Sequence, residues 1–217
     1  MTKLFEKSGS LMGIGNALSR YADSPKKSMV VTWLVGIIMF VDDYLNVLAT
    51  SFSMRNLTDR NGVPREHLAY GVNSMGACVC VLIPFTSWAA FAVGTISEQG
   101  LGFNDYVRII PYMFFPWIAI IVCLLVAIGV IPKVGLIKKA YERVAAGGPV
   151  LLEEKAGASL VNIEVDENAK PTTPLNFIVP IVVLIAAVLI FDNDVIHGII
   201  AALVVQAVMY IAQRIMT

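Results

Sequence analysis

Two adjacent carboxylates stand in the middle of a long apolar run. Asp42 and Asp43 follow the apolar stretch 36–41 and precede a second one at 45–49, interrupted only by Asn46. An ionisable side chain deep in an apolar environment is costly, so such residues are candidates for function. All sixteen Lys and Arg residues lie outside the apolar runs. Protons, bound cations or another part of the protein must therefore neutralise the pair.

Two carboxylates this close repel one another, and burial further disfavours their charged forms, so such a pair takes up and releases protons as a unit. A metal cation bound at Asp42 and Asp43 would compete with protons for the same oxygens. Such competition is the least that the exchange of a cation for protons requires. The alternative is that one aspartate caps a broken helix while the other faces a water-filled vestibule. Adjacent helical positions diverge by roughly 100°, so both can face one ion only where the backbone is unwound.

Neutral oxygen donors of the kind that hard cations use lie near the pair and in the next apolar run. Pro84 lies within that run and is expected to free carbonyl groups in the preceding turn. For the two hydroxyl residues just after it, the alternative is a hydrogen bond back to their own helix. The candidate ion- or substrate-binding residues beside the aspartates are Asn46, Asn73, Ser74, Thr86 and Ser87.

The composition indicates a membrane protein made of helices. Hydrophobic residues make up 57% of the 217 residues and charged residues 15%, and five apolar runs are long enough, or nearly so, to cross a hydrocarbon layer of about 30 Å. The balanced net charge excludes the basic surplus that is typical of nucleic-acid binders. The five runs are 29–54, 71–96, 109–131, 175–191 and 195–212.

The order of these runs predicts four regions. Residues 1–28 form an amphipathic segment at the cytoplasmic membrane surface, and 29–132 form the membrane region that holds the ion pathway. Residues 133–174 form a polar cytoplasmic loop, because they contain too little apolar material for a core of their own. Residues 175–217 form a transmembrane hairpin.

The distribution of basic residues predicts how the first run meets the membrane, because Lys and Arg are retained in cytoplasmic loops. If all five runs cross, the basic residues divide into six on one side and ten on the other. If the run 29–54 enters and leaves on one side, fifteen lie on one side and one on the other. We therefore expect about four transmembrane helices plus a re-entrant hairpin of broken helices, with its tip near Asp42 and Asp43.

Three stretches carry a resemblance to a known family. The stretches Phe40–Asn46, Met54–Arg60 and Pro64–Tyr70 together resemble the central portion of the NhaC-type sodium/proton antiporters of the ion transporter superfamily. The likeness continues through Val81–Trp88 and, more loosely, through 110–116. It implies a multi-pass protein of the bacterial inner membrane, built as an inverted-repeat transporter, that exchanges sodium or another cation for protons.

The resemblance makes Asp42, Asp43 and Asn46 the matching site positions, with sodium as the metal ion and no cofactor beyond the transported sodium and proton. Where the family usually has an aspartate, this chain has Asn73, which puts the selectivity for sodium in doubt. Relatives are roughly twice as long. The expected partners are thus the lipid bilayer and a second repeat or complementary chain, this chain being a fragment or a split half, with a homodimer as a further possibility.

Two alternatives remain open. Some family members couple sodium to the movement of organic acids or amino acids instead of exchanging it for protons. A membrane prenyltransferase-like enzyme would use the Asp-Asp-x-x-Asn motif at 42–46 to bind magnesium and a diphosphate, but it needs a second acidic motif, for which only Asp192 and Asp194 are available. We therefore expect a transporter and not an enzyme.

Overall fold

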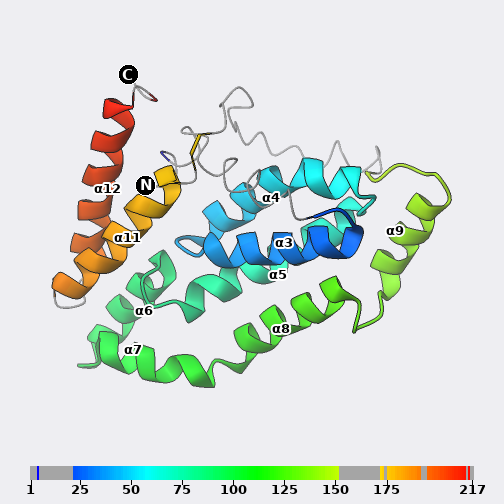
Figure 1. Cartoon of the computed structure of the whole chain (residues 1–217). Coiled ribbons are helices and arrows are strands. Elements are labelled where there is room, and N and C mark those ends of the chain that lie inside the picture. The colour runs from blue at the N-terminus through cyan, green and yellow to red at the C-terminus, as the bar shows by residue number, and fades with distance from the viewer. Residues whose placement is uncertain are drawn as a thin grey trace.

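The computed structural model describes residues 22–151, 172–173, 175–191 and 195–213, together with Leu4 and Ile215. Within these ranges every regular element is a helix (Figure 1), which confirms the all-α class. The elements are α3 (Pro25–Ile38), α4 (Asp43–Arg60), α5 (Arg65–Leu82), α6 (Ser87–Ser97), α7 (Phe103–Ile109), the 3₁₀ turn η1 (Ile110–Tyr112), α8 (Phe114–Ile128), α9 (Gly135–Ala145), α11 (Leu175–Ile190) and α12 (Val195–Ala212).

Helices α3 and α4 form an antiparallel hairpin (Figure 1). At the outer ends, the amide of Asn61 donates to Ser28 Oγ over 2.9 Å. Near the turn, Asn46 Nδ2 donates to the carbonyl oxygen of Gly36 over 2.6 Å. The turn itself lies at 39–42, where the sequence places the tip of the hairpin.

A second interruption separates α5 from α6, and the axes of the two helices bend by 49°. Pro84 lies in the gap and has no N–H to continue the helix. Thr86 begins the new helix as its N-cap, because its Oγ1 accepts a hydrogen bond from the backbone N–H of Ala89 over 3.1 Å. The break that Pro84 predicts is therefore confirmed.

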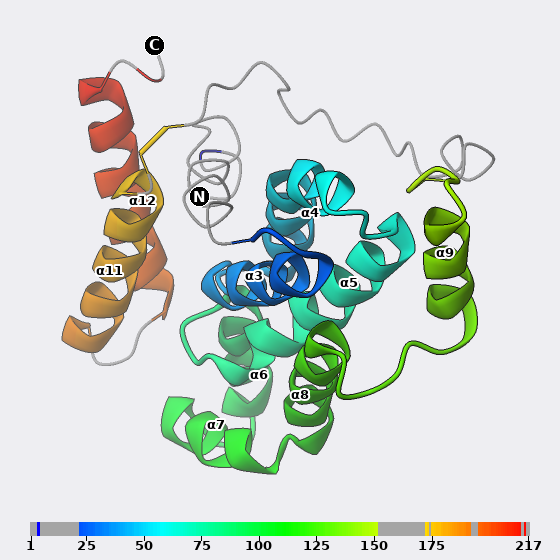
Figure 2. The same ribbon diagram turned by 45° about the vertical axis from the view of Figure 1, so that its right-hand side comes forward.

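Helix α5 lies at the centre of the packing and contacts α3, α4 and α8 (Figure 2). The buried side chains of Met75 and Val79 on α5 pack with Ile120 on α8. The indole Nε1 of Trp33, on α3, donates to the carbonyl oxygen of Ile120 over 3.0 Å and joins α3 to α8. Apolar packing and the hydrogen bond of Trp33 thus hold the α3–α4 hairpin against α5 and α8.

The polar stretch 133–174 contains more structure than the sequence analysis expects of a loop. Its described part includes the helix α9, and Tyr141 of that helix reaches the buried ring of His67 on α5, with Oη 2.9 Å from Nδ1. Residues 133–174 contain too little apolar material for a core of their own. They contain enough for one helix that docks on α5. Residues 152–171 and 174 lie outside the described residues.

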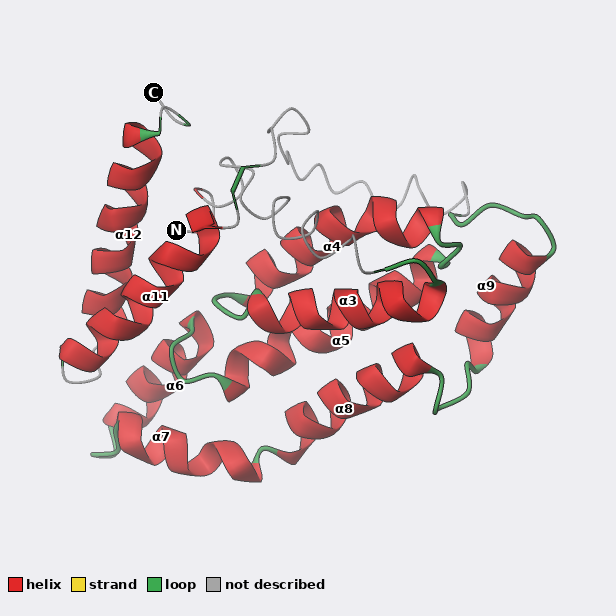
Figure 3. Ribbon diagram, viewed as in Figure 1, coloured by secondary structure: helices red, strands yellow, loops and turns green. Residues whose placement is uncertain are grey.

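Helices α11 and α12 pair as a hairpin (Figure 3). The crossing of a membrane by residues 175–217 stays a prediction. The hydroxyl of Tyr210 donates to the carbonyl oxygen of Asn176 over 2.9 Å, and Asn176 Nδ2 donates to Gln213 Oε1 over 2.9 Å. These bonds satisfy buried polar groups between two otherwise apolar helices. Of the predicted segment 1–28, only Leu4 and residues 22–28 are described, and Pro25 already begins α3.

In the described part of the chain no unbroken helix combines the length and the apolar character needed to cross a membrane. Two bent pairs meet both criteria when their helices are counted together, namely α5 with α6, and α7 and η1 with α8.

Candidate functional site

The two helix interruptions meet. The backbone N–H of Ser87, at the start of α6, donates to the carbonyl oxygen of Val41 over 3.2 Å. The thiol of Cys80, in the last turn of α5, donates to the carbonyl oxygen of Phe40 over 3.0 Å. Residues 39–42 and 83–86 are therefore held against one another, although about forty residues separate them in the sequence.

Asp42 stabilises the junction between the two helix interruptions, residues 39–42 and 83–86. It has an extended backbone and caps α4, because its Oδ1 accepts the backbone N–H of Leu45 over 3.0 Å. Its Oδ2 accepts the hydroxyl of Ser87 over 2.9 Å. Both carboxylate oxygens thus have a donor, and the aspartate ties the first turn of α4 to the first turn of α6.

Asp43 has different surroundings, although it is the next residue. It is the first residue within α4 and is partly buried. Among the described residues, no hydrogen bond or ion pair reaches its carboxylate. The first half of the alternative noted from the sequence, in which one aspartate caps a broken helix, is therefore what Asp42 shows. Whether Asp43 faces a water-filled vestibule stays a prediction.

The charge of the aspartates is compensated in part by helix termini. The N-termini of α4 and α6 both lie at the junction, and each presents the positive end of a helix dipole. Five ion pairs are formed among the described residues, and none of them involves Asp42 or Asp43. Both carboxylates are partly exposed and not deeply buried as their apolar flanks suggest.

Asn46 and Thr86 hold the broken backbone together. The fully buried Asn46 gives its amide to the carbonyl oxygen of Gly36, an acceptor that the end of α3 leaves without a helical partner. Thr86 Oγ1 donates to the carbonyl oxygens of Cys80 and Ile83, over 2.6 Å and 3.2 Å. For Thr86 the structure thus favours a hydrogen bond back to the preceding helix, the alternative noted for it from the sequence.

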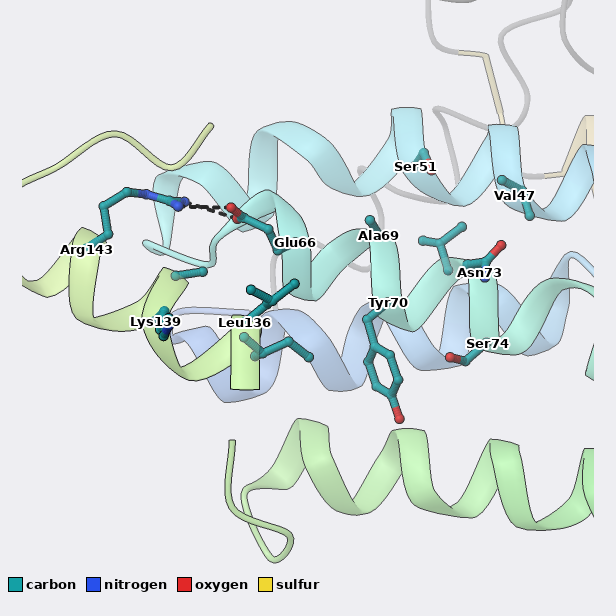
Figure 4. Close-up of a pocket in the computed structure, with 13 residues that line it drawn as sticks. Val47, Ser51, Glu66, Ala69, Tyr70, Asn73, Ser74, Leu136, Lys139 and Arg143 are labelled. Atoms are coloured by element: carbon teal, nitrogen blue, oxygen red, sulfur yellow. Dashed lines mark hydrogen bonds and ion pairs between the residues drawn. The ribbon is translucent and has the colours of Figure 1, made fainter. Parts of the chain in front are cut away.

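Asn73 and Ser74 do not reach the junction directly. They line a cavity of about 870 Å³ between α4, α5 and α9 (Figure 4). Figure 4 shows Asn73 near Val47 at one end of this cavity and the ion pair of Glu66 with Arg143 at the other. The sequence-predicted residues therefore divide into two groups, one at the starts of α4 and α6 beside the junction and one on α5 beside the cavity.

Two close approaches escaped the sequence analysis. A Cβ atom at Gly76 would lie 2.8 Å from Val47 Cγ2 and 3.4 Å from the carbonyl oxygen of Asp43. A Cβ at Gly36 would lie 3.2 Å from Met75 Cε. Both glycines let α5 approach the hairpin closely, and their positions within apolar runs were the only signal in the sequence.

The described residues contain no cluster of three or more His, Cys, Asp or Glu side chains that could hold a metal ion. The junction instead offers carboxylate, hydroxyl and carbonyl oxygens. Such oxygens suit hard cations. Asp192 and Asp194, the second acidic motif that a diphosphate-binding enzyme would need, lie outside the described residues.

Comparisons with known proteins give one partial likeness. Over 97 residues the chain is 35% identical to a protein of Haemophilus influenzae that is described as uncharacterized. The match covers 44% of this chain and 18% of that protein, so it spans less than a fifth of the relative's length. No protein-family profile matches the chain, and no solved structure matches it.

Proposed function

We propose that the chain is the ion-binding part of a secondary active transporter in a bacterial inner membrane, and that it exchanges a cation for protons at Asp43. The observation that carries this proposal is the contact between two helix interruptions beside a partly buried carboxylate that has no basic partner among the described residues. Interrupted helices are tolerated in membranes where the freed backbone groups line a site.

Exposed apolar side chains support the membrane setting. Large aromatic side chains on α6 and around the start of α8 are more than 60% exposed, a pattern more typical of a lipid- or protein-facing surface than of one in water. The α11–α12 hairpin carries a similar set of exposed aliphatic residues. The aromatic residues are Phe91, Tyr112, Phe114 and Phe115.

The hairpin α3–α4 supports the re-entrant arrangement. Its two outer ends are joined by the hydrogen bond between Asn61 and Ser28, so both lie at one end of the molecule. The charged residues Lys26, Lys27 and Arg60 lie at these ends, where the positive-inside rule places the cytoplasm. The tip, with both aspartates, then lies at depth in the membrane.

Exchange at Asp43 would result from competition between a cation and a proton for the same carboxyl group. The protonated carboxyl group is neutral, and a cation that binds there releases the proton to solution, so one positive charge replaces another. Sodium is the proposed cation because the sequence resembles sodium/proton antiporters, and a second repeat or complementary chain is proposed to close the site from the other side.

The proposal is tested with the complete protein in sealed vesicles that contain a pH-sensitive dye. A sodium gradient should drive proton movement in the parent protein, and Asp43→Asn should abolish it while the helical content stays unchanged. Proton movement that survives the combined Asp42→Asn and Asp43→Asn substitutions would refute the assignment of the site.

A further inference from the structure

The break between α5 and α6 leaves two carbonyl groups of α5 without a backbone donor among the described residues. In a continuous helix the residue at position 84 would bond to the carbonyl oxygen of Cys80, but Pro84 has no N–H. Thr86 Oγ1 donates to that oxygen instead, over 2.6 Å. The second carbonyl group, that of Val81, receives its hydrogen bond from a more distant part of the chain.

Tyr106, on α7, supplies the donor for Val81. Its hydroxyl donates to the carbonyl oxygen of Val81 over 2.7 Å, and its side chain is only 4% exposed. A buried carbonyl group that loses its donor destabilises the structure around it. In a hydrocarbon layer the loss is more severe, because no water can replace the donor. Tyr106 is not among the site residues predicted from the sequence.

A contact between two aromatic rings places α7 against the same break. Phe103, the first residue of α7, packs on Phe85 in the break, with ring centroids 5.9 Å apart. Both rings also pack against the core cluster that contains Met39 and Val41, in the turn of the α3–α4 hairpin. Helix α7 lies beside α6 (Figure 1) and therefore supports the break through a ring contact and a hydroxyl group.

The end of α5 is bonded to the turn that precedes Asp43. The thiol of Cys80, the residue before Val81, donates to the carbonyl oxygen of Phe40 over 3.0 Å. Phe40 lies three residues before Asp43. Displacement of the last turn of α5 would therefore displace the backbone that carries both aspartates.

We propose that Tyr106 is a positioning residue for the exchange site, because it holds the last turn of α5 and, through that turn, the backbone beside Asp43. This inference rests on the proposed function, since it assigns Tyr106 a part in cation binding at that carboxylate. In this role Tyr106 does not contact the cation. Its loss should therefore weaken cation binding without removing the proton that is exchanged.

The test compares Tyr106→Phe with Tyr210→Phe in the complete protein in detergent. Tyr210 is the matched control, because it is also buried and its hydroxyl also donates to a backbone carbonyl oxygen, that of Asn176. Each substitution removes one hydroxyl group and keeps the ring. In Tyr106→Phe the sodium concentration for half-maximal proton release should rise roughly tenfold, with the total release unchanged. In Tyr210→Phe this concentration should equal that of the parent protein.

A second measurement follows the break itself and does not depend on proton release. Cys80 is fully buried, so in proteins whose other cysteines are replaced by alanine its reaction with methyl methanethiosulfonate reports opening of the break. Tyr106→Phe should raise the rate of this reaction roughly tenfold, and Tyr210→Phe should leave it unchanged. Phe103→Leu should also raise the rate, because it weakens the ring contact of α7.

An unchanged Cys80 rate in both Tyr106→Phe and Phe103→Leu would overturn the proposal. A faster rate without a change in the sodium dependence of proton release would overturn the positioning of the site. An equal change of the sodium dependence in Tyr210→Phe would overturn it too, because any loss of stability would then have this effect. A parent protein that releases no protons would refute the proposed function instead, while the Cys80 rates would still decide whether Tyr106 holds the break.

Discussion

Asp42 and Asp43 are chemically identical neighbours whose surroundings divide their roles. Asp42 accepts hydrogen bonds from Leu45 N–H and the Ser87 hydroxyl, so its charge stabilises the junction of two helices. Asp43 shares a face of α4 with Val47, and no basic side chain in the described part of the chain forms an ion pair with it. We therefore assign the structural role to the first aspartate and the exchange role to the second.

The capping role of Asp42 is tested by its effect on stability. Asp42→Ala removes the side-chain acceptor and should lower the free energy of unfolding by about 1 kcal/mol, within a range of about 0.5–2 kcal/mol. Asp42→Asn keeps an acceptor at the same position and should cost much less. Denaturant unfolding followed by circular dichroism measures both, and equal losses for the two variants would contradict the capping role.

The residue scale is also where sequence reasoning was least complete. Asp42 and Asp43 could be singled out because ionisable groups are rare in apolar runs, and Ser87 because hydroxyl oxygens suit hard cations. The different roles of the two aspartates could not be predicted, because they depend on which residue adopts the extended backbone before α4. Asn46 was predicted as a ligand, yet its amide bonds to the carbonyl of Gly36, a partner that only the folded hairpin brings near.

At the scale of the helices, the site depends on how closely α4 approaches α5. Gly76→Ala would place a Cβ 2.8 Å from Val47 Cγ2, and forced repacking of this kind costs about 1–3 kcal/mol. Val47→Ala removes the clashing atom, so the double variant should be more stable than the sum of the single effects predicts. Thermal unfolding of the four proteins measures this coupling, and additive effects would show that the approach is looser than described.

The docking of α9 should depend on pH through Tyr141. Burial raises the pKa of Tyr141 to about 12, whereas an unperturbed tyrosine has a pKa of about 10. The neutral phenol therefore contributes stability that is complete below about pH 10 and is lost as the pH rises through the folded value near 12.

Tyr141→Phe cannot ionise and serves as the reference for this effect. The stability of the parent protein relative to Tyr141→Phe should fall between about pH 10 and about pH 12, as measured by denaturant unfolding. A difference that stays constant across this range would show that the phenol is not buried against α5.

Helix breaks were predictable to different degrees. Pro84 predicts the break between α5 and α6 because it has no N–H to donate. The turn at 39–42 contains no proline, and its prediction depended on the distribution of Lys and Arg around the run 29–54. Helix α9 was not predicted, because Tyr141 and Arg143 of that helix bind His67 and Glu66, which lie far away in the sequence.

At the scale of the whole molecule, the all-helical class followed from composition and from the lengths of the apolar runs. The contact between the two breaks did not, because no local pattern relates Val41 to Ser87. The position of the chain in a membrane stays a prediction that labelling can test.

The re-entrant hairpin predicts that both its ends face the same side of the membrane. Single cysteines at Lys27 and Arg60 should react with an impermeant maleimide from the cytoplasmic side only, because Asn61 and Ser28 join these ends. A cysteine at Arg108, the one basic residue predicted on the other side, is the control. Labelling of Lys27 and Arg60 positions from opposite faces would show that the hairpin crosses the membrane.

The most direct test of cation exchange at Asp43 is the release of protons when sodium is added to the purified complete protein in weakly buffered detergent solution. The parent protein and Asp42→Asn should both release protons in a saturable manner, and Asp43→Asn should release none. Undiminished release from Asp43→Asn, in a protein that remains folded, would contradict the exchange of a cation for a proton at this carboxylate.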